Sequence, residues 1–433
     1  MKTLENRIGI FLSLLLAVIL LLNVCSVGAW ADNILPDNGH LPLTQKLIDL
    51  LETSPELKGL MEESLEMARK INPNPDTNPA QDLASLYTFL DRAYTCMPWN
   101  VLDEEYPDLY DTIDQCVDYF WFLVDQPLPE LGGEGYYYPS LQYHEPIASW
   151  IKEYAETWGD YLDTEDSWND EYYELFLNAE KFHLKDGWYA DSNVWKTWNE
   201  FFARGLISPD KRPIADCDLV APADSKPQGV WQLDSEGNLK NSRGVSIKSG
   251  VFSSVVDLIG RDSAYCNSFG DGILTHTFLD VNDYHRYHFP ISGTVLEVRK
   301  ISGTNAAGGV TIWDAENNRY RLLDQKAGWQ MIETRDCVIL DTEFGLVAIL
   351  PIGMSQICSC NFEESVQPGA QVSKGDPMGY FLFGGSDIVM VFQSGVEFES
   401  LVPADESGGL KHILAGEPYA ALHVQQEELS LDE

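Results

Sequence analysis

Two short apolar segments near the C-terminus are separated by the sequence Gly384-Gly385-Ser386-Asp387. The first segment, 380–383, is aromatic and apolar, and the second, 388–392, is rich in β-branched side chains. Both compositions are typical of buried strands. Glycine allows backbone angles that other residues resist, so the chain can turn sharply here and present Ser386. One interpretation is an ordinary tight turn. The other is a serine placed to attack the preceding glycine carbonyl, which no side chain crowds.

The chain of 433 residues carries a formal net charge of −40. Such a charge argues against binding to nucleic acid and against docking on anionic lipid through a basic patch. Residues 32–195 hold 34 acidic and 8 basic side chains, so most of the excess lies in the N-terminal half. We expect a solvated acidic surface there rather than a specific cation site.

Residues 1–31 have the layout of a secretory signal peptide. Lys2 and Arg7 precede an apolar run over 8–22, and Ala-Trp-Ala at 29–31 is similar to a cleavage site. Because the run is close to the roughly 20 residues that span a bilayer, an uncleaved membrane anchor is the alternative. The protein is therefore expected to be exported, to a periplasm or the cell exterior, or to be anchored through this segment.

Seven cysteines follow residue 31, in an odd and scattered set that does not describe a disulfide framework. Cys358 and Cys360 form the only close pair in the sequence. Because no second close pair completes a four-ligand zinc site, the sequence predicts no metal centre.

The region 32–195 is predicted to be mainly helical. Ser54-Pro55 is typical of an N-cap followed by proline at the first helical position. Apolar residues over 57–68 and 147–162 recur at the spacing of one helical face. The aromatic residues among them could line a pocket, but such stripes more often belong to a core.

Beyond residue 195, short β-rich runs alternate with turns of Gly, Asn and Asp. The expected strands are 293–298, 310–313, 320–323, 338–340 and 346–351. Hairpin connections are expected at 317–318 and 343–345. The predicted fold class is α+β, with a mainly helical acidic domain at 32–195 followed by a mainly antiparallel β domain at 196–433.

Three stretches of the second half supply an acid, two histidines and a serine. Asp224 ends Ala-Pro-Ala-Asp, His285 and His288 lie in Asp-Tyr-His-Arg-Tyr-His, and Ser386 follows the glycine pair. An acid that orients an imidazole, and an imidazole that takes a hydroxyl proton, make an activated nucleophile. Each stretch also has a plainer interpretation, as a turn aspartate, as packed histidines or as a turn serine. The two histidines lack a further metal ligand at a telling spacing.

The order of these stretches resembles that of phosphatidylserine decarboxylases, which make their own pyruvoyl cofactor. The resemblance covers roughly residues 196–400 and rests on Phe-Phe-x-Arg at 201–204, Ala-Pro-Ala-Asp at 221–224, Asp-Tyr-His-Arg-x-His at 283–288 and Gly-Gly-Ser at 384–386. More loosely, the helical half resembles the extension of one branch of this family, which includes decarboxylases of free aromatic amino acids.

The resemblance implies a role for each of four residues. Asp224 would be the orienting acid, His288 the base, and Ser386 the serine that cleaves the chain and becomes the pyruvoyl group. That group would bind the substrate amine and accept electrons when carbon dioxide leaves. His285 would position the substrate carboxylate or handle the proton that replaces it.

Cleavage would fall between Gly385 and Ser386 and give a small chain, Ser386–Glu433, that stays associated with the large one. Asp387 departs from the family, which usually has threonine or another small hydroxyl residue after the serine. A carboxylate there could repel the oxyanion that forms at Gly385, or it could point away or steer the serine. The retained acid, base and Gly-Gly-Ser motif favour a chain that processes itself.

Two classes of function are open. The first is a pyruvoyl-dependent decarboxylase acting on phosphatidylserine, with membrane contact, or on a free amino acid such as an aromatic one. The second is an uncleaved, non-catalytic member of the family that acts as a binding protein.

Overall fold

A computed structural model describes residues 39–102, 117–132, 138–189, 194–240, 245–247, 250–252, 254–305, 310–323, 332–353, 359–383 and 386–424. The predicted signal peptide or anchor and the predicted cleavage partner Gly385 lie outside these residues. Among the helices that are described, none is both long enough and apolar enough to cross a membrane.

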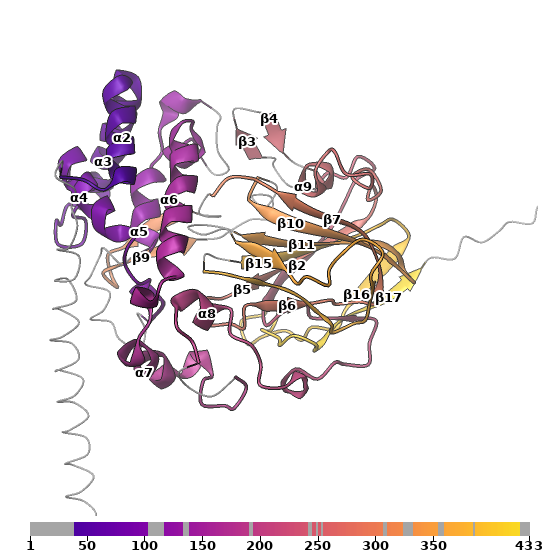
Figure 1. Ribbon diagram of the computed structural model, residues 1–433. Helices are drawn as coiled ribbons and strands as arrows, with labels where there is room; N and C mark the ends of the chain where they lie inside the picture. Colours follow the sequence, from indigo (N-terminus) through magenta and orange to yellow (C-terminus); the bar gives the residue numbers. More distant parts are fainter. Residues whose placement is uncertain are drawn as a thin grey trace, which may run out of the picture.

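The N-terminal half is helical, as predicted, and lies beside a β-sheet half (Figure 1). The α-helices are α2 (Pro42–Thr53), α3 (Pro55–Ile71), α4 (Leu83–Ala93), α5 (Val117–Val124), α6 (Ile147–Leu162), α7 (Asp170–Asn178), α8 (Trp198–Phe202) and, within the sheet half, α9 (Val255–Ile259). Single 3₁₀ turns are η1 (Trp99–Leu102), η4 (Pro129–Leu131), η5 (Leu141–Tyr143), η6 (Glu165–Ser167), η7 (Glu180–Phe182) and η8 (Pro209–Lys211).

Helix α3 begins where the sequence predicted. The Ser54 side chain accepts a hydrogen bond from the backbone N–H of Leu57 at 3.3 Å, and Pro55 occupies the first helical position. The apolar stripes of α3 and α6 are buried, including Trp150 and Trp158. These aromatic residues therefore form core, which was the plainer of the two interpretations.

The second half is mainly antiparallel β, which confirms the predicted fold class. Its strands are β1 (Leu219–Val220), β2 (Lys226–Gln232), β3 (Val245–Ile247), β4 (Gly250–Phe252), β5 (Ile273–Leu279), β6 (Arg286–His288), β7 (Gly293–Ile301), β8 (Val310–Asp314), β9 (Arg319–Leu323), β10 (Arg335–Thr342), β11 (Gly345–Gly353), β12 (Cys360–Phe362), β13 (Gln371–Val372), β14 (Pro377–Phe381), β15 (Ser386–Phe392), β16 (Val396–Ser400) and β17 (Pro418–Val424). Every expected strand is present, and both expected hairpin connections join neighbouring strands.

The principal sheet has seven strands in the order β13-β7-β10-β11-β15-β5-β2. Strand β15 lies inside this sheet, between β11 and β5, and all seven of its residues are buried. Two smaller sheets, β12-β14-β6 and β1-β17-β16, accompany it. The sequence placed Ser386 in the connecting turn, whereas the structure makes it the first residue of β15.

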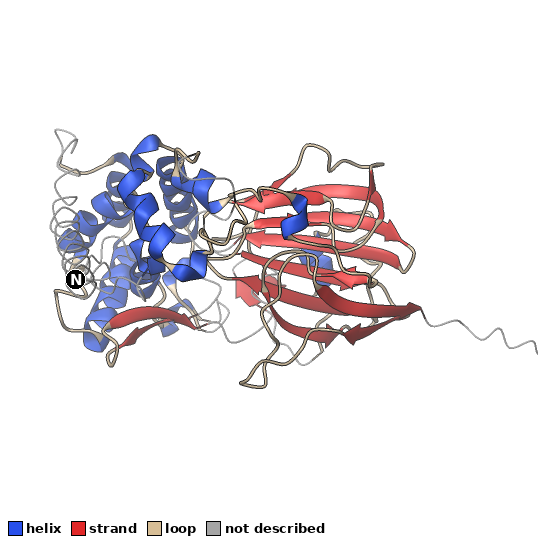
Figure 2. Ribbon diagram, turned by 90° about the horizontal axis from the view of Figure 1, so that it is seen from below, coloured by secondary structure: helices blue, strands red, loops and turns tan. Residues whose placement is uncertain are grey.

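Hairpin β8–β9 is separate from the principal sheet and packs against helix α5 (Figure 2). Tyr320 of β9 is buried among the helices, where its hydroxyl donates to the carbonyl oxygen of Thr77 and accepts from the Asn72 amide, both at 2.8 Å. One hydrophobic core runs through both halves of the molecule. The two halves are therefore packed together, and the domain boundary at residue 195 stays a prediction.

Candidate active site

Ser386 occupies a fully buried position at the start of a central strand. Its Cα lies opposite Gly353 of β11 on one side and Leu279 of β5 on the other. The side chain is 0% exposed, and its hydroxyl oxygen has no hydrogen-bond partner among the residues that the structure describes. A buried hydroxyl without a partner is costly, so this one calls for an explanation, such as a reactive role.

His288 ends a strand that pairs with the segment before the glycine pair. Strand β6 pairs with β14, and the register sets His288 opposite Pro377, at the end of β14 that is farther from Ser386. The backbone N–H of His288 donates to the carbonyl oxygen of Pro222 at 2.7 Å, which places His288 beside the segment that carries Asp224.

A pair of hydrogen-bonding distances fixes the His288 ring. Its Nδ1 lies 3.1 Å from the carbonyl oxygen of Gly375, and its Nε2 lies 3.3 Å from the Tyr284 hydroxyl. An N–H at Nδ1 donating to Gly375 leaves Nε2 without a proton. Burial lowers the pKa of His288, and the charge of Asp224 offsets this only in part. The imidazole is therefore neutral at neutral pH, as a base must be.

Asp224 is held by an arginine rather than by a histidine. Its carboxylate accepts hydrogen bonds from Nε of Arg212 at 2.8 Å, from a terminal nitrogen of the same guanidinium, and from the backbone N–H of Ala415 at 2.8 Å. Both side chains of this ion pair are only 3% exposed. The Arg212 guanidinium also lies over the ring of Tyr284, 5.6 Å from its centre, and so connects Asp224 to the His288 contact.

His285, the residue just before β6, is buried. Its Nδ1 lies 2.9 Å from the carbonyl oxygen of Asp283, and its ring stacks on Phe202 with 3.8 Å between ring centres. Burial and the charge of Arg204 hold the pKa of His285 well below its usual range, so this ring is neutral as well. Its own carbonyl oxygen accepts a hydrogen bond from the N–H of Phe381 at 2.9 Å, which ties His285 to the strand before the glycine pair.

Aromatic side chains from the helical half surround the segment just before Gly384. The ring of Phe383 meets Trp158 of α6 edge-on at 5.3 Å and lies 5.6 Å from Trp198 of α8. The N–H of Phe383 points at the Asn199 side-chain oxygen, 3.4 Å away, and the Asn199 amide donates to Asp163 at 2.9 Å. The helices thus contact the residues that position the expected cleavage bond.

Comparison with known proteins identifies the group to which this arrangement belongs. A family model described as phosphatidylserine decarboxylase matches residues 198–421. The chain belongs to the phosphatidylserine decarboxylase family. It is 31% identical to the phosphatidylserine decarboxylase proenzyme of Alcanivorax borkumensis, over 51% of this chain and 76% of that protein.

Two further relatives differ in how much they share with the chain. Decarboxylase iboD of Amanita muscaria is 26% identical over 61% of this chain and 83% of that protein. Phosphatidylserine decarboxylase proenzyme 2 of Oryza sativa subsp. japonica is 33% identical over 51% of this chain, but the match spans only 33% of that longer protein. Members of the family are carboxy-lyases and are generally pyruvoyl-dependent, so this protein is a decarboxylase.

Within this decarboxylase, the structure brings two of the four predicted residues together and leaves His285 and Ser386 outside their cluster. Asp224 and His288 share a cluster with Arg212 and Tyr284, whereas no hydrogen bond joins Ser386 to either of them. Catalytic hydrogen bonds are often long before a site is engaged, so the four assigned roles stay predictions. Among the described residues, no group of three His, Cys, Asp or Glu side chains could hold a metal ion.

Sequence reasoning missed two members of this cluster. Arg212 lies between the Phe-Phe-x-Arg and Ala-Pro-Ala-Asp motifs, and Tyr284 lies within Asp-Tyr-His-Arg-x-His, but the sequence alone indicated no role for either. A buried aspartate needs a cationic or hydrogen-bonding partner, so the prediction of Asp224 as an acid could have prompted a search for an arginine.

For Asp387, which replaces the usual hydroxyl residue of the family, the structure agrees with the alternative in which the carboxylate points away from the serine. Its carboxylate accepts a hydrogen bond from Nε2 of His276 on β5. Successive side chains of a strand point to opposite faces of the sheet, so Asp387 points away from the face that carries Ser386.

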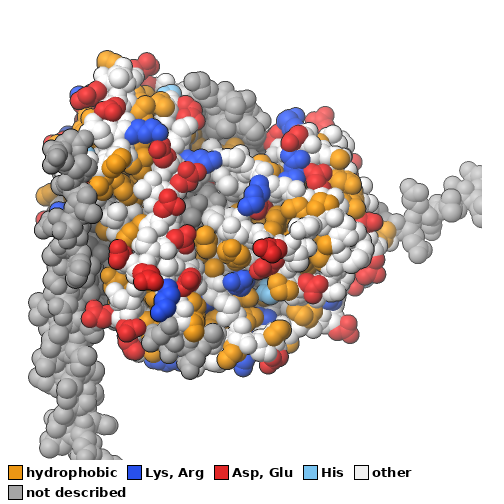
Figure 3. Space-filling view, in the orientation of Figure 1, with side chains coloured by type: hydrophobic (Ala, Val, Ile, Leu, Met, Phe, Trp, Pro, Cys, Tyr) orange, Lys and Arg blue, Asp and Glu red, His pale blue; other side chains and the backbone are white. Residues whose placement is uncertain are grey.

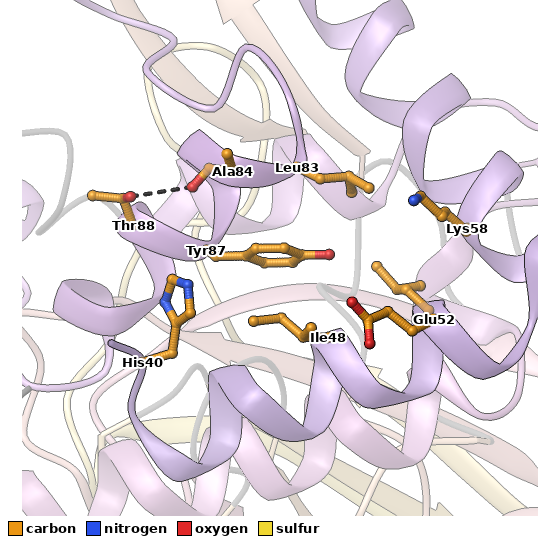
Figure 4. A pocket seen from close by; sticks show the side chains of 9 residues that line it. His40, Ile48, Glu52, Lys58, Leu83, Ala84, Tyr87 and Thr88 are labelled. Atoms are coloured by element: carbon orange, nitrogen blue, oxygen red, sulfur yellow. Dashed lines mark hydrogen bonds between the residues drawn. The ribbon is translucent and has the colours of Figure 1, made fainter. Parts of the chain in front are cut away.

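A pocket of about 430 Å³ lies in the helical half, away from the predicted catalytic residues (Figure 4). It is bordered by helices α2, α3 and α4, and the Tyr87 ring lies across its middle. None of Asp224, His285, His288 and Ser386 lines it, so it is separate from the decarboxylase chemistry.

The surface carries many acidic side chains, as expected from the net negative charge of the sequence. On the face shown in Figure 3, Asp and Glu side chains are spread over both halves, interspersed with Lys and Arg. The described part of the decarboxylase thus presents a mixed, solvated surface on this side.

Proposed function

We propose that this decarboxylase cleaves its own chain between Gly385 and Ser386 and works with the pyruvoyl group made from Ser386. The observation that carries the proposal is the Ser386 hydroxyl, which is fully buried, has no hydrogen-bond partner in the described part of the chain and begins a central strand directly after two glycines. This position fits a pyruvoyl group because it is shielded from water and anchored by strand pairing on both sides.

Processing begins with transfer of the acyl group from nitrogen to oxygen. His288 takes the hydroxyl proton, Ser386 Oγ attacks the Gly385 carbonyl carbon, and the peptide C–N bond breaks as its nitrogen gains a proton. Removal of the Cα proton of residue 386 then breaks the Cβ–Oγ bond and leaves a carboxylate on Gly385. Water hydrolyses the remaining unsaturated N-terminus, releasing ammonia. The sum is one water consumed and one ammonia formed for each chain that is cut.

The chain's own residues have defined tasks in this scheme. The ion pair with Arg212 keeps Asp224 oriented, and the nearby negative charge stabilises His288 once it has taken a proton. The neutral, buried His285 handles a proton or orients the substrate carboxylate. When bound, a pyruvoyl group supplies an electron sink for the electrons left behind by carbon dioxide.

For the substrate we propose a free amino acid, with aromatic amino acids as the first candidates. The fully buried position of Ser386 suits a small, soluble molecule that can enter the protein interior. The match to decarboxylase iboD also extends over more of this chain than the matches to the two proenzymes. Phosphatidylserine, with membrane contact through an exported or anchored N-terminus, is the second candidate and is favoured by the family description.

The two chains would stay associated after cleavage. The small chain would begin with β15, which lies between β11 and β5 of the large chain, and its strand β17 pairs with β1. Separation would require breaking the principal sheet.

The first test of this proposal is the intact mass of the purified protein beside that of Ser386→Ala. We expect wild-type protein to give a fragment that starts at residue 386 with a pyruvoyl mass, and Ser386→Ala to stay whole. A wild-type chain that stays whole after prolonged incubation would overturn the proposal and favour the uncleaved binding protein.

The substrate is tested on the cleaved protein by measuring released carbon dioxide. Tryptophan, tyrosine and phenylalanine are compared with phosphatidylserine in detergent micelles, with Ser386→Ala as the blank. Release from a free amino acid and not from micelles supports the first candidate, and the reverse result replaces it with the second.

A further inference from the structure

The side chain of Asp387, the residue after Ser386, lies on the face of the principal sheet opposite to that of Ser386, which we call the reverse face. Along β15, Ile388, Met390 and Phe392 pack in one hydrophobic cluster, while Val389 and Val391 pack in another. Because side chains alternate, Ser386 shares the face of the first cluster and Asp387 shares the face of the second. The two side chains therefore leave the backbone in opposite directions.

The surroundings of Asp387 are apolar except for one imidazole. Its cross-strand neighbours are Ile352 on β11 and Phe278 on β5, and its side chain is 0% exposed. Nε2 of His276 binds one carboxylate oxygen, and within the described part of the chain the other oxygen has no hydrogen-bond partner. Burial raises the pKa of Asp387, and His276 is the group that opposes this rise.

His276 is itself well placed to hold this carboxylate. It sits on β5 directly opposite Val389, so it shares the reverse face with Asp387. Its side chain is 4% exposed, and its ring lies 6.3 Å from that of Trp231. An imidazole packed in this way has little freedom to turn, and it fixes the direction of the Asp387 side chain.

The charge of Asp387 bears on the cleavage step because of its position in the chain. Its backbone nitrogen is bonded to the carbonyl carbon of residue 386, and negative charge develops on that carbonyl when the Cα proton of residue 386 is removed. A bare carboxylate so close in a water-free site disfavours this charge, since electrostatic effects are strong where the dielectric constant is low. A carboxylate turned away and bound to an imidazole has a much weaker effect.

We propose that His276 is a positioning residue for self-cleavage, which holds the Asp387 carboxylate on the reverse face of the sheet by donating a hydrogen bond to it. The proposal rests on the proposed function, because it assumes that the bond before Ser386 is cut. It explains how a chain with an acidic residue after its serine keeps a working cleavage site.

The test follows the rate of cleavage in freshly refolded proteins by intact mass. His276→Leu removes the donor that holds the Asp387 side chain on the reverse face, so cleavage should slow by about tenfold or more. His276→Gln keeps a donor and should cleave at a rate near that of the wild type. The double variant His276→Leu/Asp387→Leu has no buried charge left and should also recover most of the rate, since apolar pairs often replace buried ionic ones.

A matched control separates positioning from a loss of stability. Thr275 lies next to His276 on β5, faces the other way and shares a hydrogen bond of 2.7 Å with the Tyr419 hydroxyl. Thr275→Val should lower the melting temperature but leave the cleavage rate unchanged. All rates are compared at a temperature where circular dichroism shows each variant to be folded, and His276→Asn, whose shorter amide does not reach the carboxylate, replaces His276→Leu should the latter not fold.

The outcomes distinguish this inference from the function on which it rests. A wild-type chain that is never cut overturns both. A wild-type chain that is cut, together with a folded His276→Leu that is cut equally fast, overturns only the role of His276. A double variant as slow as His276→Leu would show that the loss comes from packing and would also overturn it.

Discussion

Two buried aspartates, in two regions of the molecule, are accommodated in different ways. Asp224, in the candidate active site, is paired with the guanidinium of Arg212. Asp125, at the junction between the end of α5 and hairpin β8–β9, accepts hydrogen bonds from uncharged groups, among them the Gln142 amide, the Ser140 hydroxyl at 3.3 Å, the Thr311 N–H at 3.2 Å and the Tyr138 hydroxyl. Burial raises the pKa of Asp125 to about 8.

The difference shows which region is built to keep a negative charge. At the junction, hydrogen bonds are enough to hold the elements together, and the acid can take up a proton. In the candidate active site, the Arg212 guanidinium supplies a full positive charge to Asp224, as its predicted role as an ionised acid requires. Substitutions in the first region should therefore change stability alone, and substitutions in the second should change the cleavage chemistry as well.

The largest expected effect is the loss of His288. His288→Ala removes the base for Ser386, and cleavage should slow by about a hundredfold to ten-thousandfold, the usual contribution of a general base. The rate is measured by intact mass over time. His40→Ala is the control, because His40 binds Asp91 in the helical half and should leave the rate unchanged. Cleavage of His288→Ala at the wild-type rate would exclude it as the base.

The second largest effect is expected on stability when Arg212, the ion-pair partner of Asp224, is replaced. Arg212→Leu strands a buried carboxylate and should lower the free energy of unfolding by about 3–5 kcal/mol. Urea unfolding is measured in a Ser386→Ala background, so that every molecule is a single chain. Lys46→Ala removes an exposed partner of Glu153 and should cost less than about 1 kcal/mol. Equal losses for both variants would mean that Asp224 does not depend on Arg212.

A smaller effect is expected at the junction. Tyr320→Phe removes the hydroxyl that bridges Thr77 and Asn72, and it should lower the free energy of unfolding by about 1–3 kcal/mol. Its cleavage rate should match that of the wild type while the protein is folded. Tyr87→Phe, whose hydroxyl faces the surface pocket in Figure 4, is the matched control and should change little. A slowed cleavage in Tyr320→Phe would show that the two regions are coupled.

The smallest effect is that of mild acid on cleavage. The base must be neutral, so the rate falls as pH drops through the pKa of His288, and burial lowers that pKa below its ordinary value of 6.5. The rate at pH 6.5 should therefore stay close to its value at neutral pH. A rate profile whose midpoint lies at or above 6.5 would contradict this assignment of the base.

Much of the fold follows from local patterns in the sequence. The Ser54-Pro55 start of α3, the buried stripes of two helices and the hairpins of the β half were predicted because each depends on residues close together in the chain. The candidate residues Asp224, His285, His288 and Ser386 were chosen from motifs, and the structure places the first and third in one cluster.

The contacts that were missed join residues far apart in the sequence. His276 precedes Asp387 by 111 positions, and nothing local in an apolar strand says that its one imidazole faces a carboxylate. The packing of β8–β9 on α5 and the role of Tyr284 likewise depend on the order of strands and helices in space. Even the start of β15 at Ser386 is set by its pairing with Gly353 and Leu279, which the sequence alone did not reveal.

The strand order also determines when the principal sheet can be completed during synthesis of the protein. Of the seven strands in the principal sheet, β15 is the last to leave the ribosome, yet its place is between β11 and β5. Until residues 386–392 have been synthesised, the position between β11 and β5 is empty. Ser386 can pair with these strands only once β15 has been made. A chain whose translation stops early therefore never completes this sheet, and the proposed self-cleavage would mark a protein that has been made and folded to the end of this strand.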